Sequence, residues 1–171
     1  MKYRRKSWRE KLADKKGWPK VMKLEKRFPC YNAVHKMGAE VGDPIVLANP
    51  SEIVELMGKV PNGRLTTIVE ICRALAARHG VKGCCSLTTG IFIMTAANAV
   101  EESRRENGNL KIPYWRTLKA DGYLNDKYPG GAQSHKELLE KEGHRVLSKG
   151  KKYRVEDYQD HLVSYSTAAG G

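Results

Sequence analysis

The tetrad Pro113-Tyr114-Trp115-Arg116 sets a phenol, an indole and a guanidinium group side by side. Two adjacent aromatic rings can form a wall for a flat ligand, and a nucleic-acid base stacked on such a ring gains roughly 1–3 kcal/mol. Neither ring suits covalent chemistry at neutral pH, because the phenol has a pKa of about 10 and the indole only donates a hydrogen bond. The alternative is that both rings fill space between the elements and belong to the core.

The net charge of +12 is the strongest signal in the composition. Residues 1–30 contain twelve basic and three acidic residues, so nine of the net positive charges lie in this segment. Such a segment favours a polyanionic partner, because each neutralised phosphate releases condensed counterions. A solvated tail is the alternative, although Trp8 and Trp18 favour packing onto a surface. We expect a basic arm with short helical pieces over residues 1–40.

The four cysteines are not spaced like metal ligands: Cys30, Cys72, Cys84 and Cys85 contain no CxxC pair. We therefore expect reduced thiols, no metal and no cofactor. The chain has no apolar run long enough for a membrane span and no apolar signal-peptide segment near Met1, so we expect no membrane partner. A cytoplasmic protein, associated with the nucleoid if bacterial, is the expectation.

Capping signals define the helices that must position the tetrad. Asn49-Pro50-Ser51 predicts a helix start after an extended segment at 43–48, and Thr66 or Thr67 predicts the start of a helix that ends near His79. Thr88 or Thr89 predicts a long helix from Gly90 to about Glu106. The run of four apolar residues at 91–94 is typical of core. Residues 133–142 predict a short helix, and residues 145–155 predict a β-hairpin with a cationic turn.

Several segments follow one another in an order that resembles the DNA-binding domain of the O6-alkylguanine-DNA alkyltransferases, over about residues 51–147. Residues 60–65 are similar to the turn that opens the helix-turn-helix of that family. Residues 96–107 resemble its recognition helix and hinge, and residues 113–116 stand where the family has Pro-Cys-His-Arg. Residues 128–131 are similar to the loop that walls the base pocket, and residues 142–145 close the block.

The chain departs from this family at the residues that carry its chemistry. Tyr114 stands at the position of the alkyl-accepting cysteine, and Trp115 at that of the histidine that helps to deprotonate it. Asn98 falls at the position of the arginine that fills the gap left by an extruded base, and Ile68 at that of a tyrosine that presses on the target phosphate. Glu142 is left with no histidine to orient. In lacking the cysteine, the chain is similar to the alkyltransferase-like proteins, which bind alkylated DNA and hand the lesion to excision repair.

This resemblance implies a mainly α fold with a small β-hairpin, of the winged helix-turn-helix type. We expect a basic N-terminal arm over residues 1–50, a winged-helix DNA-binding domain over 51–163 and a disordered tail over 164–171. The implied function is DNA binding without alkyl transfer and without a catalytic residue, with recognition of alkylated or flipped bases in DNA repair as the finer expectation. We expect a monomer on double-stranded DNA, with excision-repair proteins as further partners.

The site residues expected from the resemblance and the charge pattern form two sets. The base pocket is expected to contain Tyr114, Trp115, Tyr128 and Gly130. Contacts with DNA are expected from polar and basic side chains: Thr88, Thr89, Asn98, Arg116, Lys149, Lys151 and Lys152. Each contact has a structural alternative. The threonines can cap a helix, Arg116 can bridge a buried carboxylate such as Glu142, which we favour, and the lysines can form a solvated turn.

Three other functions stay open on the sequence alone. The chain could be a winged-helix regulator or architectural protein on undamaged DNA, or an alkyltransferase that uses another acceptor residue. It could also be a protein-interaction module whose basic arm binds an acidic partner or RNA. A structure in which the arm covers the recognition helix would favour this last function.

Overall fold

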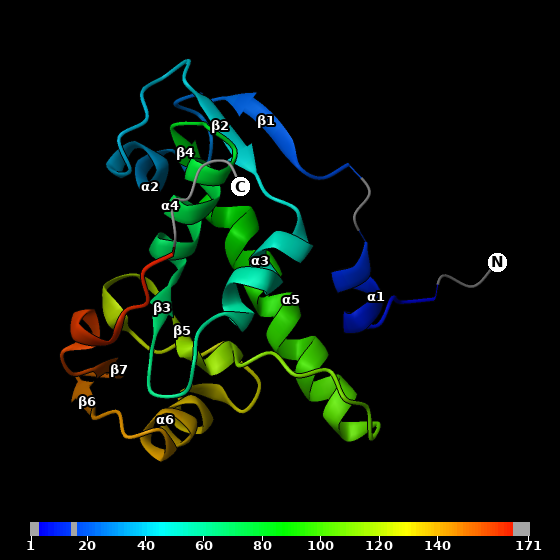
Figure 1. The fold of residues 1–171 in the computed structure, drawn as a ribbon, viewed down its shortest axis with the longest axis vertical. Coiled ribbons are helices and arrows are strands. Elements are labelled where there is room, and N and C mark those ends of the chain that lie inside the picture. The colour runs from blue at the N-terminus through cyan, green and yellow to red at the C-terminus, as the bar shows by residue number, and fades with distance from the viewer. Residues whose placement is uncertain (1–3, 15–16, 166–171) are drawn as a thin grey trace.

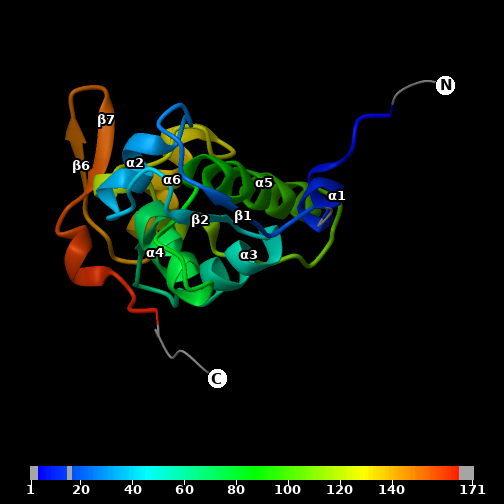
Figure 2. The ribbon, with the colours of Figure 1, turned by 90° about the horizontal axis from the view of Figure 1, so that it is seen from above.

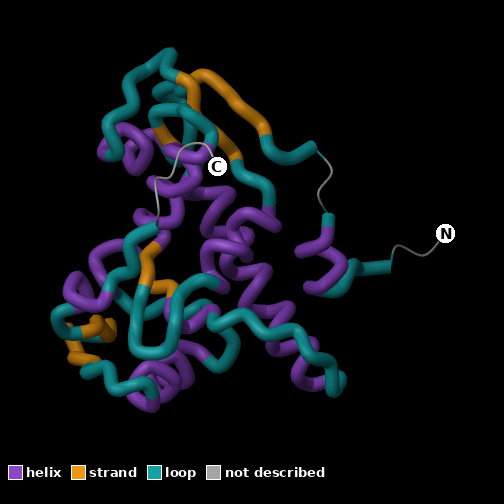
Figure 3. The backbone as a smooth tube through the Cα atoms, in the orientation of Figure 1, coloured by secondary structure: helices purple, strands orange, loops and turns teal. Residues whose placement is uncertain are grey.

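The computed structural model describes residues 4–14 and 17–165 of the chain. Helices dominate the middle of the molecule and the strands are short, as Figure 3 shows. In chain order the α-helices are α1 (Trp8–Ala13), α2 (Tyr31–Lys36), α3 (Pro50–Gly58), α4 (Ile68–Arg78), α5 (Ser86–Arg105) and α6 (Gly131–Lys141). The strands are β1 (Lys20–Lys23), β2 (Pro44–Leu47), β3 (Thr66–Thr67), β4 (Gly83–Cys84), β5 (Thr117–Leu118), β6 (Val146–Lys149) and β7 (Lys152–Val155). The prediction of a mainly α fold with a small β-hairpin is confirmed.

The longest helix, α5, runs through the middle of the molecule, and α1, α3 and α4 pack against it (Figure 1). Ala96, Ala97 and Ala99 on α5 are fully buried. Their small side chains let the neighbouring helices approach closely. Tyr114 belongs to the same core, together with Ile53 of α3. The tetrad is therefore fixed against α5 by packing.

Helices α3 and α4 begin where the sequence predicts. Asn49 caps α3 and shares a capping box with Glu52, and Thr67 caps α4. The long helix α5 begins at Ser86, earlier than the predicted start at Gly90. The chain is held in the sheet up to Cys85, whose N–H donates to a β2 carbonyl at 2.9 Å, and the helix follows directly. A tertiary contact therefore sets this helix start, in place of the threonines that local capping preferences favour.

The described part of the predicted arm is folded onto the rest of the chain. β1 pairs antiparallel with β2, and β2 pairs parallel with β4, so the segment before residue 50 shares a sheet with the turn between α4 and α5. Leu24, Val34 and Ile45 are fully buried in a small core beside this sheet. Short helical pieces are present over residues 1–40 as α1 and α2, and the structure adds the strand β1 between them, which the sequence did not predict. The domain boundary at residue 50 stays a prediction, and residues 166–171 of the predicted tail lie outside the described residues.

Helix α1 lies against the C-terminal half of α5 (Figure 2). The carboxylate of Glu102 on α5 accepts hydrogen bonds from the backbone N–H groups of Trp8 at 3.1 Å and Arg9 at 3.2 Å. The guanidinium of Arg9 forms ion pairs with Glu102 and Glu106. Trp18 packs edge to face on an aromatic ring of α5, with centroids 5.5 Å apart. The N-terminal segment thus covers part of the predicted recognition helix, which is the arrangement expected for the protein-interaction alternative.

The predicted hairpin is present as β6 and β7, which are paired antiparallel with Lys149 opposite Lys152. Gly150 in the turn has a φ of 60°, which glycine adopts without strain. A second short pair, β3 with β5, joins Thr66 to Thr117 in parallel. This pair holds the residues that follow the tetrad against the start of α4.

Within residues 4–14 and 17–165, no helix is long and apolar enough to cross a membrane. The same residues contain no group of three or more His, Cys, Asp or Glu side chains placed to hold a metal ion. The four cysteines are buried free thiols.

Candidate functional site

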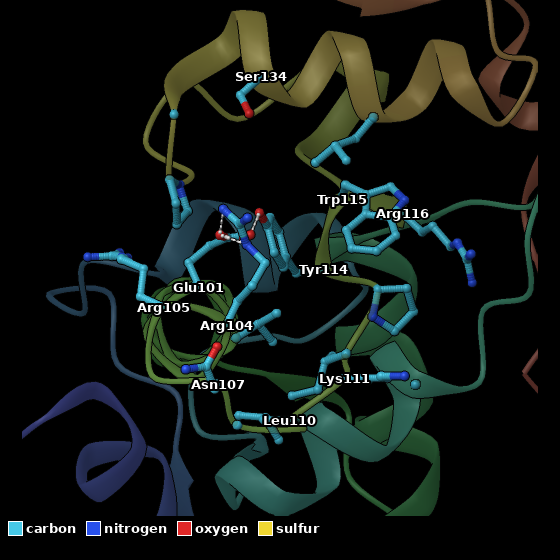
Figure 4. Close-up of a pocket in the computed structure, with 18 residues that line it drawn as sticks. Glu101, Arg104, Arg105, Asn107, Leu110, Lys111, Tyr114, Trp115, Arg116 and Ser134 are labelled. Atoms are coloured by element: carbon cyan, nitrogen blue, oxygen red, sulfur yellow. Dashed lines mark hydrogen bonds and ion pairs between the residues drawn. The ribbon is translucent and has the colours of Figure 1, made fainter.

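An open cleft of about 1080 Å³ lies beside the tetrad, between the C-terminal half of α5 and the start of α6 (Figure 4). Tyr114 and Trp115 line the cleft, and Gly130 lines it from the loop before α6. Tyr128, the fourth residue predicted for the base pocket, packs behind Tyr114, with ring centroids 5.2 Å apart. The structure therefore gathers three of the four residues around one open space and places the fourth in the layer behind them.

Tyr114 closes the back of this cleft. Its side chain is almost fully buried, with 2% of its surface exposed, and its hydroxyl donates to Glu101 Oε1 at 2.9 Å. Trp115 and Tyr128 both meet its ring edge to face. Burial and the neighbouring Glu101 carboxylate raise the pKa of the Tyr114 phenol above its usual value. The hydroxyl therefore stays protonated, and the ring serves as packing and not as a nucleophile.

Glu142 ties the other two members of the tetrad together. It accepts a hydrogen bond from Trp115 Nε1 at 3.0 Å, and it forms an ion pair with Arg116, whose Nη2 lies 2.7 Å from Oε1. Arg116 Nη1 also donates to the carbonyl oxygen of Val60 at 2.7 Å. Burial acts to raise the pKa of Glu142, but the hydrogen bonds from Arg116 and Trp115 outweigh it, and the pKa lies below its usual value. Glu142 thus orients the indole N–H of Trp115 and the guanidinium of Arg116 together.

The placement of Arg116 argues against the predicted contact with DNA and agrees with the structural alternative. Its side chain is 15% exposed, and its guanidinium is already bonded to Glu142 and Val60. The same guanidinium lies 5.5 Å from the centroid of the Trp115 ring. Arg116 therefore supports the wall of the cleft from inside the protein.

The loop that carries Gly130 is held in place by a buried histidine. His135 Nδ1 accepts a hydrogen bond from the N–H of Asn125 at 3.1 Å, and its Nε2 lies 2.7 Å from the carbonyl oxygen of Trp115. This pairing assigns the proton to Nε2, because the carbonyl oxygen can only accept. Burial lowers the pKa of His135 to about 4, although the bond to Trp115 acts in the opposite direction. The imidazole is therefore neutral at physiological pH.

The neutral state of His135 predicts a loss of stability in mild acid. In the unfolded chain a histidine has a pKa of about 6.5, so between this value and the folded pKa of about 4 the unfolded chain binds a proton that the folded protein does not. The free energy of unfolding should therefore fall as the pH drops through this window, by roughly 2–3 kcal/mol in total. Urea unfolding at intervals between pH 7 and pH 4 measures this fall.

The variant His135→Gln checks the assignment. A glutamine lacks the titrating ring, so the fall between pH 7 and pH 4 should become shallower, with a residual slope from His144, whose pKa burial also lowers. His35→Gln, at an exposed position on α2, is the matched control, and the slope of His135→Gln is compared with it. An unchanged slope in His135→Gln would assign the pH dependence to other groups.

Gly130 has a conformation that its position demands. Its φ is 84°, and a Cβ at this position would lie 2.6 Å from the Cβ of Ser134. A larger residue would have to displace the first turn of α6. Gly130 therefore allows the loop to pass close to the helix and leaves the cleft open on this side.

Positive charge gathers at the mouth of the cleft. Arg104, Arg105 and Lys111 line it and are exposed, whereas Glu101 is bonded to Tyr114 and to Arg104. The sequence indicates that Arg104 and Arg105 face solvent at the end of a helix, but it does not reveal their place at the cleft. The loop over residues 107–113 brings Lys111 to the same cleft, and no local motif encodes that placement.

The side chains of α5 predicted to contact DNA donate hydrogen bonds to backbone carbonyl oxygens of the same helix or of the residue just before it. The hydroxyls of Thr88 and Thr89 donate to the carbonyl oxygen of Cys85, at 3.3 and 2.8 Å, and Thr89 is fully buried. The side-chain amide of Asn98 donates to the Met94 carbonyl at 2.9 Å. Thr89 is therefore removed from the surface, whereas Thr88 and Asn98 are half-buried.

The remaining predicted contacts lie on the hairpin. Lys149, Lys151 and Lys152 are exposed, and none of them lines the cleft. Lys152 Nζ lies 5.9 Å from the centroid of the Tyr123 ring. The hairpin therefore offers a cationic surface that is separate from the cleft.

No family model and no curated protein matches the chain. Two solved structures are similar to it, each with a TM-score of 0.48 and each covering 68% of this chain and 94% of its own. One is S. pombe Atl1 in complex with damaged DNA containing O6-carboxymethylguanine, at 17% sequence identity, and the other is S. pombe ATL in complex with DNA, at 14%. A similarity of this size concerns the course of the backbone. In that course the chain is similar to these two proteins.

Proposed function

We propose that this protein binds double-stranded DNA and accepts an extruded base, alkylated bases included, in the cleft beside Trp115, without transferring an alkyl group. The observation that carries the proposal is the cleft itself, which combines an indole wall with a mouth edged by Arg104, Arg105 and Lys111. A base stacked on an aromatic ring gains roughly 1–3 kcal/mol. That gain is comparable to the few kcal/mol that extrusion costs, and a damaged base costs less to extrude.

The chemistry of the lining supports binding without transfer. Tyr114 lacks the thiol of an acceptor cysteine, and its raised pKa keeps the phenol protonated. None of the four cysteines lines the cleft. An alkyl group in the cleft therefore meets no thiolate, which is the species that attacks carbon in such transfers.

Equilibrium binding across a salt series tests the proposal. We expect tighter binding to a duplex that contains O6-methylguanine than to the unmodified duplex, and a steep fall of affinity with salt. Replacing Arg105, Lys111 or Lys151 by alanine should lower the salt slope by about 0.9 for each phosphate that the variant no longer neutralises. Lys141→Ala, an exposed position on α6 outside the cleft and the hairpin, is the control and should change nothing.

Each outcome of this series has a separate meaning. A flat salt slope would contradict DNA binding through phosphates. Equal affinity for both duplexes would contradict lesion recognition and favour a protein that binds undamaged DNA. Intact-mass measurement after incubation with methylated DNA should show no gain of a methyl group, and a gain would overturn the absence of transfer.

Further parts of the proposal follow from DNA binding. We propose a monomer that acts where the cell keeps its DNA, in the cytoplasm and on the nucleoid in a bacterium. Since the cleft holds a base without altering it, we propose that excision-repair proteins act on the lesion afterwards. Sedimentation of the protein with and without duplex DNA tests the monomer.

A further inference from the structure

The N-terminal half of α5 presents aliphatic side chains to solvent. Leu87 is 49% exposed and Ile91 is 53% exposed, although the apolar run at 91–94 is typical of core. Residues 87, 91 and 94 lie on one face of the helix, and Met94, which is half-buried and packs partly against the core, continues the same stripe. Exposed aliphatic groups gathered in this way mark a surface that another molecule covers.

This stripe is the floor of a groove of about 1040 Å³. One wall is formed by α2 with Met37, the residue that follows it, and by the first turns of α4, which contribute Ile68. The opposite wall is formed by residues 117–121, 125, 127 and 128. No residue lines both this groove and the cleft beside Trp115. The groove is therefore an opening separate from the cleft, and it includes two residues that the resemblance places at the DNA, Ile68 and Tyr128.

The rim of the groove is basic. Lys36, Arg73, Lys119 and Lys127 line it and are exposed, against the single carboxylate of Asp121 in the described lining. An apolar floor with a cationic rim is complementary to a ligand that is apolar on one face and acidic on its flanks. A DNA backbone matches the rim but would set charged phosphates and sugars against Leu87 and Ile91, which leaves the aliphatic groups without an apolar partner.

We propose that this groove binds an amphipathic α-helix of a partner protein, with apolar side chains at positions i, i+4 and i+7 and with Asp or Glu on its flanks. The stripe of residues 87, 91 and 94 repeats at the spacing of a helix face, so a helix laid along it can interlock over about two turns. The acidic flanks then face Lys36 and Arg73 on one wall and Lys119 and Lys127 on the other.

Selection from a displayed library of helical peptides with randomised flanks and face positions tests the proposal. Binders should be enriched for the i, i+4, i+7 apolar pattern and for acidic flanks. The best binder is then synthesised and titrated against the full chain by fluorescence anisotropy. Failure to enrich any pattern, or enrichment of basic flanks, would overturn the proposal.

Variants then locate the binding. The double variant Leu87→Ser/Ile91→Ser should weaken the selected peptide by about tenfold or more, because both aliphatic groups lose their buried partner. Both positions are exposed, so the fold should be retained, which circular dichroism checks. Val41→Ser, at a residue that is 58% exposed and outside the groove, is the matched control and should bind as the parent does.

Charge reversal at the rim gives an independent readout. Lys119→Glu/Lys127→Glu should weaken the acidic peptide severalfold at low salt and less at high salt. Unchanged peptide binding in the aliphatic double variant would overturn the proposal. Loss of duplex DNA binding in that variant, with peptide binding kept, would assign the groove to DNA instead. Because the two sites share no lining residue, failure of the peptide test leaves DNA binding at the cleft untouched.

Discussion

Replacing Glu142 by glutamine should lower the free energy of unfolding by about 3 kcal/mol, because it leaves the buried charge of Arg116 without its partner. The carboxylate is 8% exposed and the guanidinium 15% exposed, so water cannot compensate for the loss. The cost is high because the guanidinium also holds the Val60 carbonyl and cannot turn to solvent without giving up that bond. Urea unfolding at neutral pH, read by circular dichroism, measures the change.

Glu140→Gln is a matched control on the same helix. Glu140 pairs with Lys136 at 3.0 Å, but its side chain is 42% exposed, and pairs of this kind contribute less than about 1 kcal/mol. The chemical shift of the Trp115 indole N–H should move in Glu142→Gln and stay in Glu140→Gln, because only Glu142 accepts that hydrogen bond. A loss of stability in Glu142→Gln no larger than in the control would contradict the structural role of the pair.

Truncating Tyr114 to alanine should cost about 3–5 kcal/mol, the range measured for large aromatic side chains in well-packed cores. The ring contacts Trp115 and Tyr128, and its removal leaves a cavity that opens into the cleft. Tyr114→Phe keeps the ring and removes only the hydrogen bond to Glu101, so we expect a loss of about 1 kcal/mol. Chemical denaturation of the two variants in parallel separates ring packing from the hydroxyl.

The two Tyr114 variants also decide whether the ring belongs to the core or forms a movable wall of the cleft. If the ring is core, as its burial indicates, Tyr114→Ala must be strongly destabilising and Tyr114→Phe must keep its affinity for DNA. A small loss in Tyr114→Ala, below about 1 kcal/mol, would mean that the ring is free to swing into the cleft. DNA affinity in Tyr114→Phe, measured with the same duplexes as for the parent, completes the test.

Local capping preferences predicted the starts of the helices whose caps come from their own first turn. The start of α3 follows from Asn49 and Glu52, and that of α4 from Thr67, because each cap is made by side chains within one turn. The hairpin followed in the same way from its alternation and its glycine turn. The start of α5 did not, because it depends on the hydrogen bond of Cys85 to a strand far away in the sequence.

The candidate site was predictable as a set of residues but not as a set of roles. The motif order indicated that Tyr114, Trp115 and Gly130 lie near one another, and the structure places them around one cleft. Whether Arg116 faces a phosphate or a carboxylate depends on which group the fold brings closer, and Glu142 lies 26 positions along the chain. The exposure of Ile91 is also a tertiary property. The run of four apolar residues at 91–94 predicts a core position whether or not a neighbouring element covers it.

The contact between α1 and α5 brings the positive charge of Arg9 to the C-terminal end of α5. Arg9 compensates Glu102 and Glu106, which otherwise stand with Glu101 at the helix end where the dipole is already negative. Helix α1 has no fully buried residue, and the bonds to Glu102 and Glu106 hold it on α5 together with the packing of Leu12. Without these bonds, two unpaired carboxylates at this end of α5 would weaken the positive potential at the mouth of the cleft. The position of a few residues at the start of the chain thus sets how strongly this end of α5 attracts a polyanion.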